Sequence, residues 1–104
     1  MLSPKEQKKL QPRIRGMDIT KLTGAFDALG EPNRCTIFRN LLKKDEINVG
    51  DIAVLLKISE PLASQHLKVL LGAGLVERVK RGKNVYYSVN RKDKLVKALQ
   101  EVVE

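Results

Sequence analysis

SEPLASQHLKVLLGAG, residues 59–74, decides the fold of this chain, because both of its ends and both of its faces carry clear signals. Ser59 stands where an N-cap belongs, and Pro61 falls in the first turn, where a missing N–H costs little. Gly72 and Gly74 bracket the other end, and glycine readily takes the left-handed conformation that closes helices. The stretch therefore predicts one helix that starts after Ser59.

The side chains of this predicted helix sort into two faces. Apolar residues recur at the spacing of a stripe that packs on a core. They are Ala63, Leu67, Leu70 and Leu71. The opposite face is short-chained and rich in hydrogen-bond donors and acceptors. It holds Glu60, Pro61, Ser64, Gln65 and Lys68. Such a face suits contact with base edges in a groove, although by itself it is equally typical of an ordinary amphipathic surface helix.

Residues 75–89, LVERVKRGKNVYYSV, follow directly and predict a β-hairpin. Apolar and polar positions alternate from Val85 to Val89, which is strand spacing, and residues 75–81 form a second, less regular strand. Gly82-Lys83-Asn84 between them has turn chemistry. Four cations make the hairpin end basic: Arg78, Lys80, Arg81 and Lys83. A helix with a polar outer face followed by a basic hairpin is typical of a winged helix-turn-helix.

Three helices are predicted upstream. The first covers residues 18–29 and stops at Gly30, and the second runs from Pro32 to about Lys44. The core face of the second holds Ile37, Phe38, Leu41 and Leu42. Asn48 suits the N-cap of a third helix over residues 49–57. The tight connection at residues 57–59 is what a helix-turn-helix requires.

A last helix is predicted over residues 91–103, capped by Asn90. Its apolar positions cover more than one face, and such a helix usually has two neighbours. We therefore expect it to pack on its own domain and, together with residues 18–29, on a partner subunit. The predicted interface residues are Ile19, Leu22, Phe26, Leu95, Leu99, Val102 and Val103. The alternative is a helix packed wholly on its own domain.

Together these elements predict a mainly α fold with a small β-hairpin, in the order α-α-α-α-β-β-α. Residues 1–16 form a basic N-terminal arm and residues 17–104 form the winged helix-turn-helix domain. The arm is either a flexible solvated tail or a segment that adds phosphate contacts or wraps a partner subunit.

Composition limits the classes of function. The 104 residues suffice for one small domain with a single core, and the formal charge of +8 suggests a polyanionic partner. Aromatic residues make up 4% of the chain, which argues against a base-stacking surface for single strands. The sequence contains no long apolar run and no signal peptide, so we expect a cytoplasmic protein without a membrane partner. One cysteine excludes an internal disulfide.

Several motifs occur in order and at characteristic spacing. They are FDALGEPNR at 26–34, VGDIA at 49–53, SQHLKVL at 64–70, AGLV at 73–76, and Tyr87. In these motifs the chain resembles the ArsR/SmtB family of winged-helix bacterial and archaeal repressors over about residues 18–103. The resemblance implies a homodimer joined by the first and last helices, bound to a near-palindromic operator. It also implies that residues 59–73 are the recognition helix.

Two positions depart from that family's pattern. Leu62 stands where small or hydroxyl residues are usual, and Ala63 stands where a larger aliphatic is usual. Leu62 either contacts a thymine methyl or repacks the core. Glu60 places an acid near the DNA, where it accepts from a cytosine amine or, facing phosphate, lowers affinity.

The resemblance implies where a metal-sensing member would carry its ligands: cysteine pairs on the helix before the recognition helix, or clusters of Asp, His and Glu on the last helix. Residues 47–56 contain no Cys or His, and the last helix contains no His, so we predict no metal site and no cofactor. Cys35 is interpreted as a small buried hydrophobe rather than a redox-sensitive thiol. His66 is interpreted as a structural hydrogen bond or phosphate contact rather than a pH switch. Without a nucleophile–base pair, a Gly-rich phosphate loop or paired carboxylates, we expect no enzyme.

We therefore predict a sequence-specific regulator of transcription, a repressor that binds double-stranded DNA as a homodimer. The expected DNA-binding residues are Ser59, Glu60, Leu62, Ser64, Gln65, His66, Lys68, Arg78, Lys80, Arg81, Lys83 and Asn84. Two alternatives remain: a non-specific architectural DNA-binding protein, and a protein-interaction module whose winged helix no longer binds DNA. The sequence does not indicate an effector.

Overall fold

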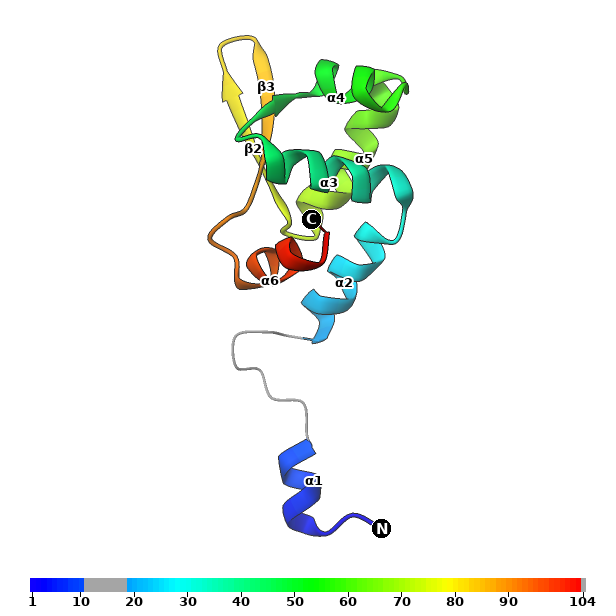
Figure 1. The fold of residues 1–104 in the computed structure, drawn as a ribbon, viewed down its shortest axis with the longest axis vertical. Coiled ribbons are helices and arrows are strands. Elements are labelled where there is room, and N and C mark those ends of the chain that lie inside the picture. Colours follow the sequence, from blue (N-terminus) through cyan, green and yellow to red (C-terminus); the bar gives the residue numbers. More distant parts are fainter. Residues whose placement is uncertain (11–18, 104) are drawn as a thin grey trace.

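The computed structural model describes residues 1–10 and 19–103 (Figure 1). Its elements are α1 (Pro4–Leu10), α2 (Ile19–Leu29), α3 (Pro32–Lys43), β1 (Ile47–Asn48), α4 (Val49–Leu56), α5 (Glu60–Gly72), β2 (Val76–Arg81), β3 (Asn84–Val89) and α6 (Lys94–Val103). The predicted winged helix-turn-helix is confirmed from α2 onward. The rest of the predicted arm, the start of the first helix at Asp18 and the final residue lie outside the described residues. Within the described ranges, no helix is long and apolar enough to cross a membrane.

Side-chain caps define where the two central helices begin, as predicted. The Asn48 side chain accepts a hydrogen bond from the Asp51 amide (2.8 Å) at the start of α4. The Ser59 hydroxyl accepts one from the Leu62 amide (3.2 Å) at the start of α5. Between them Lys57 adopts a left-handed conformation, with φ of 56°, which closes α4. These local signals fix the turn of the helix-turn-helix.

The sheet is larger than the predicted hairpin. It has three antiparallel strands in the order β1-β3-β2, with Ile47 opposite Tyr87 and Val76 opposite Val89. The prediction missed β1 because a strand of two residues is too short to show an alternating pattern. β1 ends at the cap of α4, so the hairpin is hydrogen-bonded to the helix-turn-helix through β1.

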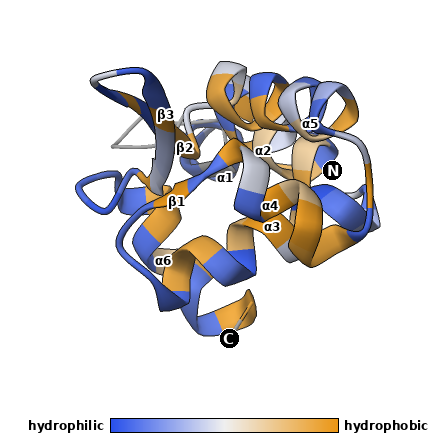
Figure 2. Cartoon of the chain, turned by 90° about the horizontal axis from the view of Figure 1, so that it is seen from above, coloured by the Kyte–Doolittle hydropathy of each residue, from blue (hydrophilic) through white to orange (hydrophobic). Residues whose placement is uncertain are grey.

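Helices α2, α3, α4, α5 and α6 and the sheet share one hydrophobic core. Its largest fully buried side chains are Phe38, Ile37, Leu41, Ile52, Leu67, Leu70, Leu75 and Val96. Figure 2 shows hydrophobic residues along α3, α4 and α6, whereas the outer end of the hairpin is hydrophilic. The predicted core face of α3 is confirmed. Leu71 was predicted in the apolar stripe of α5, but it is 37% exposed, so it lies at the edge of the buried face.

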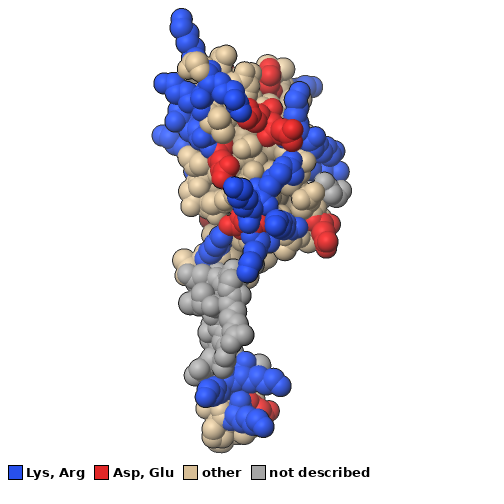
Figure 3. Space-filling model, turned by 90° about the vertical axis from the view of Figure 1, so that its left-hand side faces the viewer, with Lys and Arg blue, Asp and Glu red and all other residues tan. Residues whose placement is uncertain are grey.

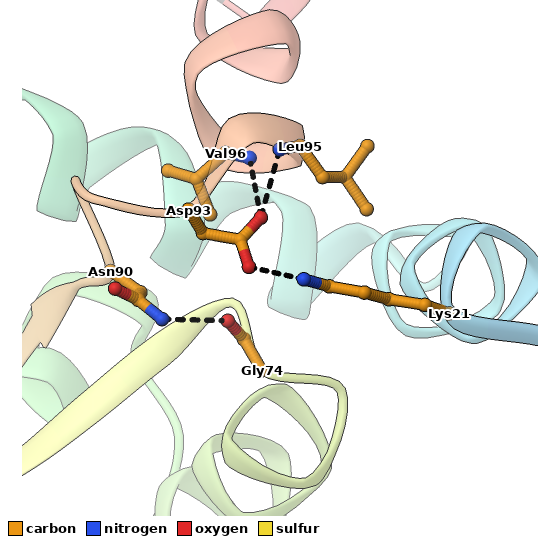
Figure 4. A network of polar contacts seen from close by, with 6 residues as sticks. All are labelled: Lys21, Gly74, Asn90, Asp93, Leu95 and Val96. Carbon is orange, nitrogen blue, oxygen red and sulfur yellow. Dashed lines mark hydrogen bonds and ion pairs between the residues drawn. The ribbon is translucent and has the colours of Figure 1, made fainter. Parts of the chain in front are cut away.

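The start of α6 differs from the prediction. Asn90 was expected to cap a helix over residues 91–103, but α6 begins at Lys94 and the cap is Asp93 (Figure 4). An Asp93 oxygen accepts from the amides of Leu95 (2.8 Å) and Val96 (3.3 Å). The Asn90 side chain instead donates to the carbonyl of Gly74 at 3.5 Å, beyond the end of α5. Asn90 therefore joins the segment after β3 to the segment after α5, and it does not cap α6.

Candidate nucleic-acid interface

Helix α5 has one fully buried face and one uncovered face. Ala63, Leu67 and Leu70 are all 0% exposed, and they hold the helix on the core. Because these positions recur at helical spacing, the residues between them face outward. Glu60, Leu62, Gln65 and Lys68 are exposed, as is the capping Ser59, while Ser64 is half-buried. The structure thus brings most of the predicted base-contacting residues to one surface.

The basic hairpin splits its cations between the two faces of the sheet. In the β2–β3 register Arg78 lies opposite Tyr87 and Lys80 opposite Val85, whereas Arg81 lies opposite Asn84. Because directly opposed residues share a face, Arg78 and Lys80 lie on the face that carries the buried Tyr87, and Arg81 lies on the other. Figure 3 shows Lys and Arg gathered at the upper end of the molecule, where the hairpin ends. The predicted basic end exists, but its cations are divided between the two faces of the sheet.

Arg81 is held by a partner that the sequence analysis missed. Its guanidinium donates two hydrogen bonds to Glu46, Nε to Oε2 at 2.9 Å and Nη2 to Oε1 at 2.5 Å. The hydrogen bond from Arg81 lowers the pKa of the Glu46 carboxyl, and the same bond raises the pKa of Arg81. A pair 35 residues apart leaves no local signal in a sequence. The fork ties the turn end of β2 to Glu46, the residue that precedes β1.

A groove of about 290 Å³ separates the hairpin from the start of the helix-turn-helix. It is lined by Asn48, Val49, Gly50, Glu60, Lys83, Asn84 and Val85. The structure therefore brings Glu60 and Lys83 to the lining of one groove. Glu60 lies so close to Gly50 that a Cβ there would sit 3.0 Å from its Oε1. Its carboxylate thus lies against the first turn of α4.

His66 lies on the flank of α5 and is largely covered. Its side chain is 12% exposed, and its Nδ1 lies 3.4 Å from Nη1 of Arg34 and 3.7 Å from Oε2 of Glu31. His66 was predicted to make a structural hydrogen bond or a phosphate contact, and in the structure it makes the hydrogen bond with Arg34. The sequence analysis did not identify Glu31 or Arg34 as functional residues, because they lie at the start of a different helix.

The predicted partner-facing surface is divided between exposed and buried residues. Ile19, Phe26 and Val102 are 55%, 56% and 80% exposed, and Leu22 and Val103 are half-buried. Leu95 and Leu99 are buried in the core of their own domain. The exposed apolar area on α2 and α6 therefore comes mainly from Ile19, Phe26 and Val102.

Other candidate chemistry is limited in the part of the chain that the structure describes. No group of three or more His, Cys, Asp or Glu side chains there is placed to hold a metal ion. Cys35 is half-buried on α3, less covered than the sequence analysis expected.

Comparison with known proteins gives consistent matches. Residues 31–78 match the family described as "Bacterial regulatory protein, arsR family". The transcriptional repressor SmtB homolog of Synechocystis sp. is 32% identical over 79% of this chain, which spans 62% of that repressor's length. The transcriptional repressor SdpR of Bacillus subtilis is 36% identical over 66% of this chain and 76% of its own. A homodimeric winged helix-turn-helix DNA-binding domain from Mycobacterium bovis, Mb0332, superimposes with a TM-score of 0.69 at 28% identity, covering 82% of this chain and 79% of that domain.

Proposed function

We propose, from the premise that this chain belongs to the ArsR family of bacterial regulatory proteins, that it represses transcription by binding operator DNA as a homodimer. The family and its winged helix-turn-helix fold are those of DNA-binding transcriptional regulators, not of enzymes. Since the chain spans less than two thirds of the SmtB homolog's length, the operator, the partner subunit and the repression are our proposals.

The observation that carries the proposal is the two-faced α5. Its inner side chains are fully buried, so the helix is rigidly backed, and its outer face offers Gln65 and Lys68 without a covering element. A bare helix of this kind fits the major groove, where glutamine amides pair with adenine and lysine pairs with guanine or phosphate. We infer that Lys83, exposed in the turn of the hairpin, contacts backbone phosphate or the minor groove. Base contacts and phosphate contacts thus come from different elements.

The homodimer is supported by the apolar surface of α2 and α6. Phe26 and Val102 are more than half exposed, and an exposed apolar surface of this kind marks an interaction site. The Mycobacterium bovis domain of the same fold is described as homodimeric. In a two-fold dimer the two recognition helices enter major grooves about 34 Å apart, which requires a near-palindromic site.

Selection of bound sequences from a pool of randomised duplexes tests the proposal. We expect enrichment of a motif with two symmetric half-sites one helical turn apart. Gln65→Ala should then relax the preference at one base pair per half-site, costing about 1–3 kcal/mol of discrimination. Binding without any enriched motif would support the architectural alternative. Absence of binding even at low salt would support a protein-interaction module.

A further inference from the structure

Three polar side chains fasten the middle of the recognition helix α5 to the corner between α2 and α3. Glu31 caps α3 by accepting the Arg34 amide at 2.9 Å, and Arg34 Nε donates to the Ala28 carbonyl in the last turn of α2 at 2.7 Å. Nη1 of the same guanidinium lies 3.4 Å from Nδ1 of His66. One arginine therefore connects three helices, and its contact on α5 lies between Gln65 and Lys68.

The hydrogen-bond chemistry of Arg34 bears on which ring nitrogen of His66 carries the proton. A guanidinium has donors only and stays charged, so the Nδ1 atom that faces it must accept. A neutral histidine that accepts at Nδ1 carries its proton on Nε2. Glu31 lies 3.7 Å from the same Nδ1 and opposes this arrangement, since a carboxylate favours a proton there. The contact from Arg34 thus favours the Nε2–H tautomer of His66, against the effect of Glu31.

We propose that Arg34 is a positioning residue for DNA readout: it holds His66 as the Nε2–H tautomer and thereby fixes the rotation of α5 about its axis. Gln65 and Lys68 neighbour His66 along the helix, so a rotation there displaces both of their side chains. Hydrogen bonds to base edges need placement within about 0.5 Å, whereas phosphate contacts by flexible lysines tolerate more. The part of this inference that concerns DNA rests on the proposed function, but the part that concerns the tautomer does not.

Arg34→Lys is the informative variant, because a lysine keeps the charge but cannot donate to Ala28 and His66 with the same fork geometry. Arg39→Lys is the matched control. It makes the same change on the same helix, where Arg39 is exposed and, within the described ranges, has no side-chain hydrogen bond or ion pair. In Arg34→Lys the ratio of operator to random-duplex affinity should fall about tenfold, comparable to losing one good base contact. Random-duplex affinity should stay unchanged, and Arg39→Lys should change neither.

Imidazole nitrogen NMR of the free protein at about pH 8, where an ordinary histidine is neutral, gives a second measurement. His66 is the sole histidine of the chain, so its signals need no assignment. The wild type should show an unprotonated Nδ1 and a protonated Nε2, and Arg34→Lys should show a mixture. A wild-type proton on Nδ1 would overturn the inference even if the variant failed to fold. An unchanged ratio of operator to random-duplex affinity in a folded Arg34→Lys variant would also overturn the inference. If the wild type showed no sequence preference, the proposed function would fail while the tautomer result still stood.

Discussion

The outer face of α5 and the outer faces of α2 and α6 are both left uncovered by the same core, yet their chemistry is opposite. On α5 the uncovered side chains include Glu60, Gln65 and Lys68. On α2 and α6 they include Phe26 and Val102, which are 56% and 80% exposed. A polar face remains hydrated until a polyanion replaces the water, whereas an apolar face gains free energy by excluding water against another protein surface. The contrast supports our proposal that the first face binds DNA and the other binds a second copy of the chain.

The largest expected effect comes from placing a charge on the apolar face. Val102→Glu occurs twice in a symmetric dimer, and each copy removes apolar contact and adds a carboxylate that burial would disfavour. We expect the dimer dissociation constant to rise about a thousandfold, or ~4 kcal/mol. Sedimentation velocity over a concentration series measures it, and operator binding should weaken in parallel.

Val54→Glu is the matched control for that change. Val54 is 76% exposed on α4, nearly as exposed as Val102, but it lies outside the predicted interface. We expect its dimer dissociation constant to equal that of the wild type. If Val54→Glu dissociated the dimer and Val102→Glu did not, the partner subunit would bind at α4 and not at the apolar faces of α2 and α6.

The next largest effect separates the two faces of α5. Leu67 is 0% exposed and Val69 is 41% exposed on the same helix. Leu67→Ala leaves a cavity in the core and should lower the free energy of unfolding by about 2–5 kcal/mol. Val69→Ala should cost less than about 1 kcal/mol, since little packing is lost. Urea denaturation of both variants checks this, and equal losses would show that α5 is buried on both sides.

Interactions between near neighbours were predictable, and interactions between distant elements were not. The Asn48 and Ser59 caps, the buried stripe of Ala63, Leu67 and Leu70 and the core face of α3 follow from spacings of three or four residues. Nothing of that kind marks the bond between Glu46 and Arg81, or that between Arg34 and His66, which are 35 and 32 residues apart. The local pattern therefore identified which side chains of α5 are exposed but gave no sign of these long-range contacts, and DNA binding by that face stays a prediction.

The cap of α6 shows why a local signal can still be assigned wrongly. Asn90 and Asp93 are both good N-cap residues, and either fits the apolar pattern that follows. Lys21 lies near Asp93 in the fold and makes an ion pair with it, while Gly74 lies near Asn90. These contacts from other elements select Asp93 as the cap and leave Asn90 to bind a carbonyl.

A smaller effect distinguishes the two cations at the end of the hairpin. Lys83 has no hydrogen bond or ion pair within the described residues, whereas Arg81 is engaged by Glu46. Lys83→Ala should weaken binding to every duplex alike and reduce the salt dependence, d log K/d log[salt], by about 0.9. Arg81→Ala should change this slope much less, because its charge already has a partner. Fluorescence anisotropy over a salt series measures both slopes. Equal changes would mean that the Glu46 pair opens on DNA.

The smallest expected effect concerns the polar contact between the two helices of the apolar surface. Lys21 on α2 makes an ion pair with Asp93, and the Asp93 side chain is 11% exposed (Figure 4). Burial alone would raise the pKa of the Asp93 carboxyl. The hydrogen bond from Lys21 and those from the amides of Leu95 and Val96 outweigh it, so the pKa is lowered. A lowered folded-state pKa stabilises the protein above the unfolded value of about 3.9, and this stability is lost as pH falls through the folded value.

Asp93→Asn isolates that charge, because asparagine caps a helix about as well as aspartate. Near neutral pH the variant should unfold more easily than the wild type by about 1 kcal/mol or less, since Lys21 is 42% exposed and screened by water. The difference should shrink as pH is lowered below about 4, first because the unfolded-state carboxyl takes up a proton and then, at lower pH, because the folded wild-type carboxyl does so too. Thermal unfolding from pH 7 to pH 3 measures it. The lowered pKa values of Glu6 and Glu46 affect both proteins equally and cancel. Because asparagine keeps the cap, the absence of any difference at neutral pH would show that Asp93 acts through its cap alone, and that the ion pair does not stabilise the packing of α2 beside α6.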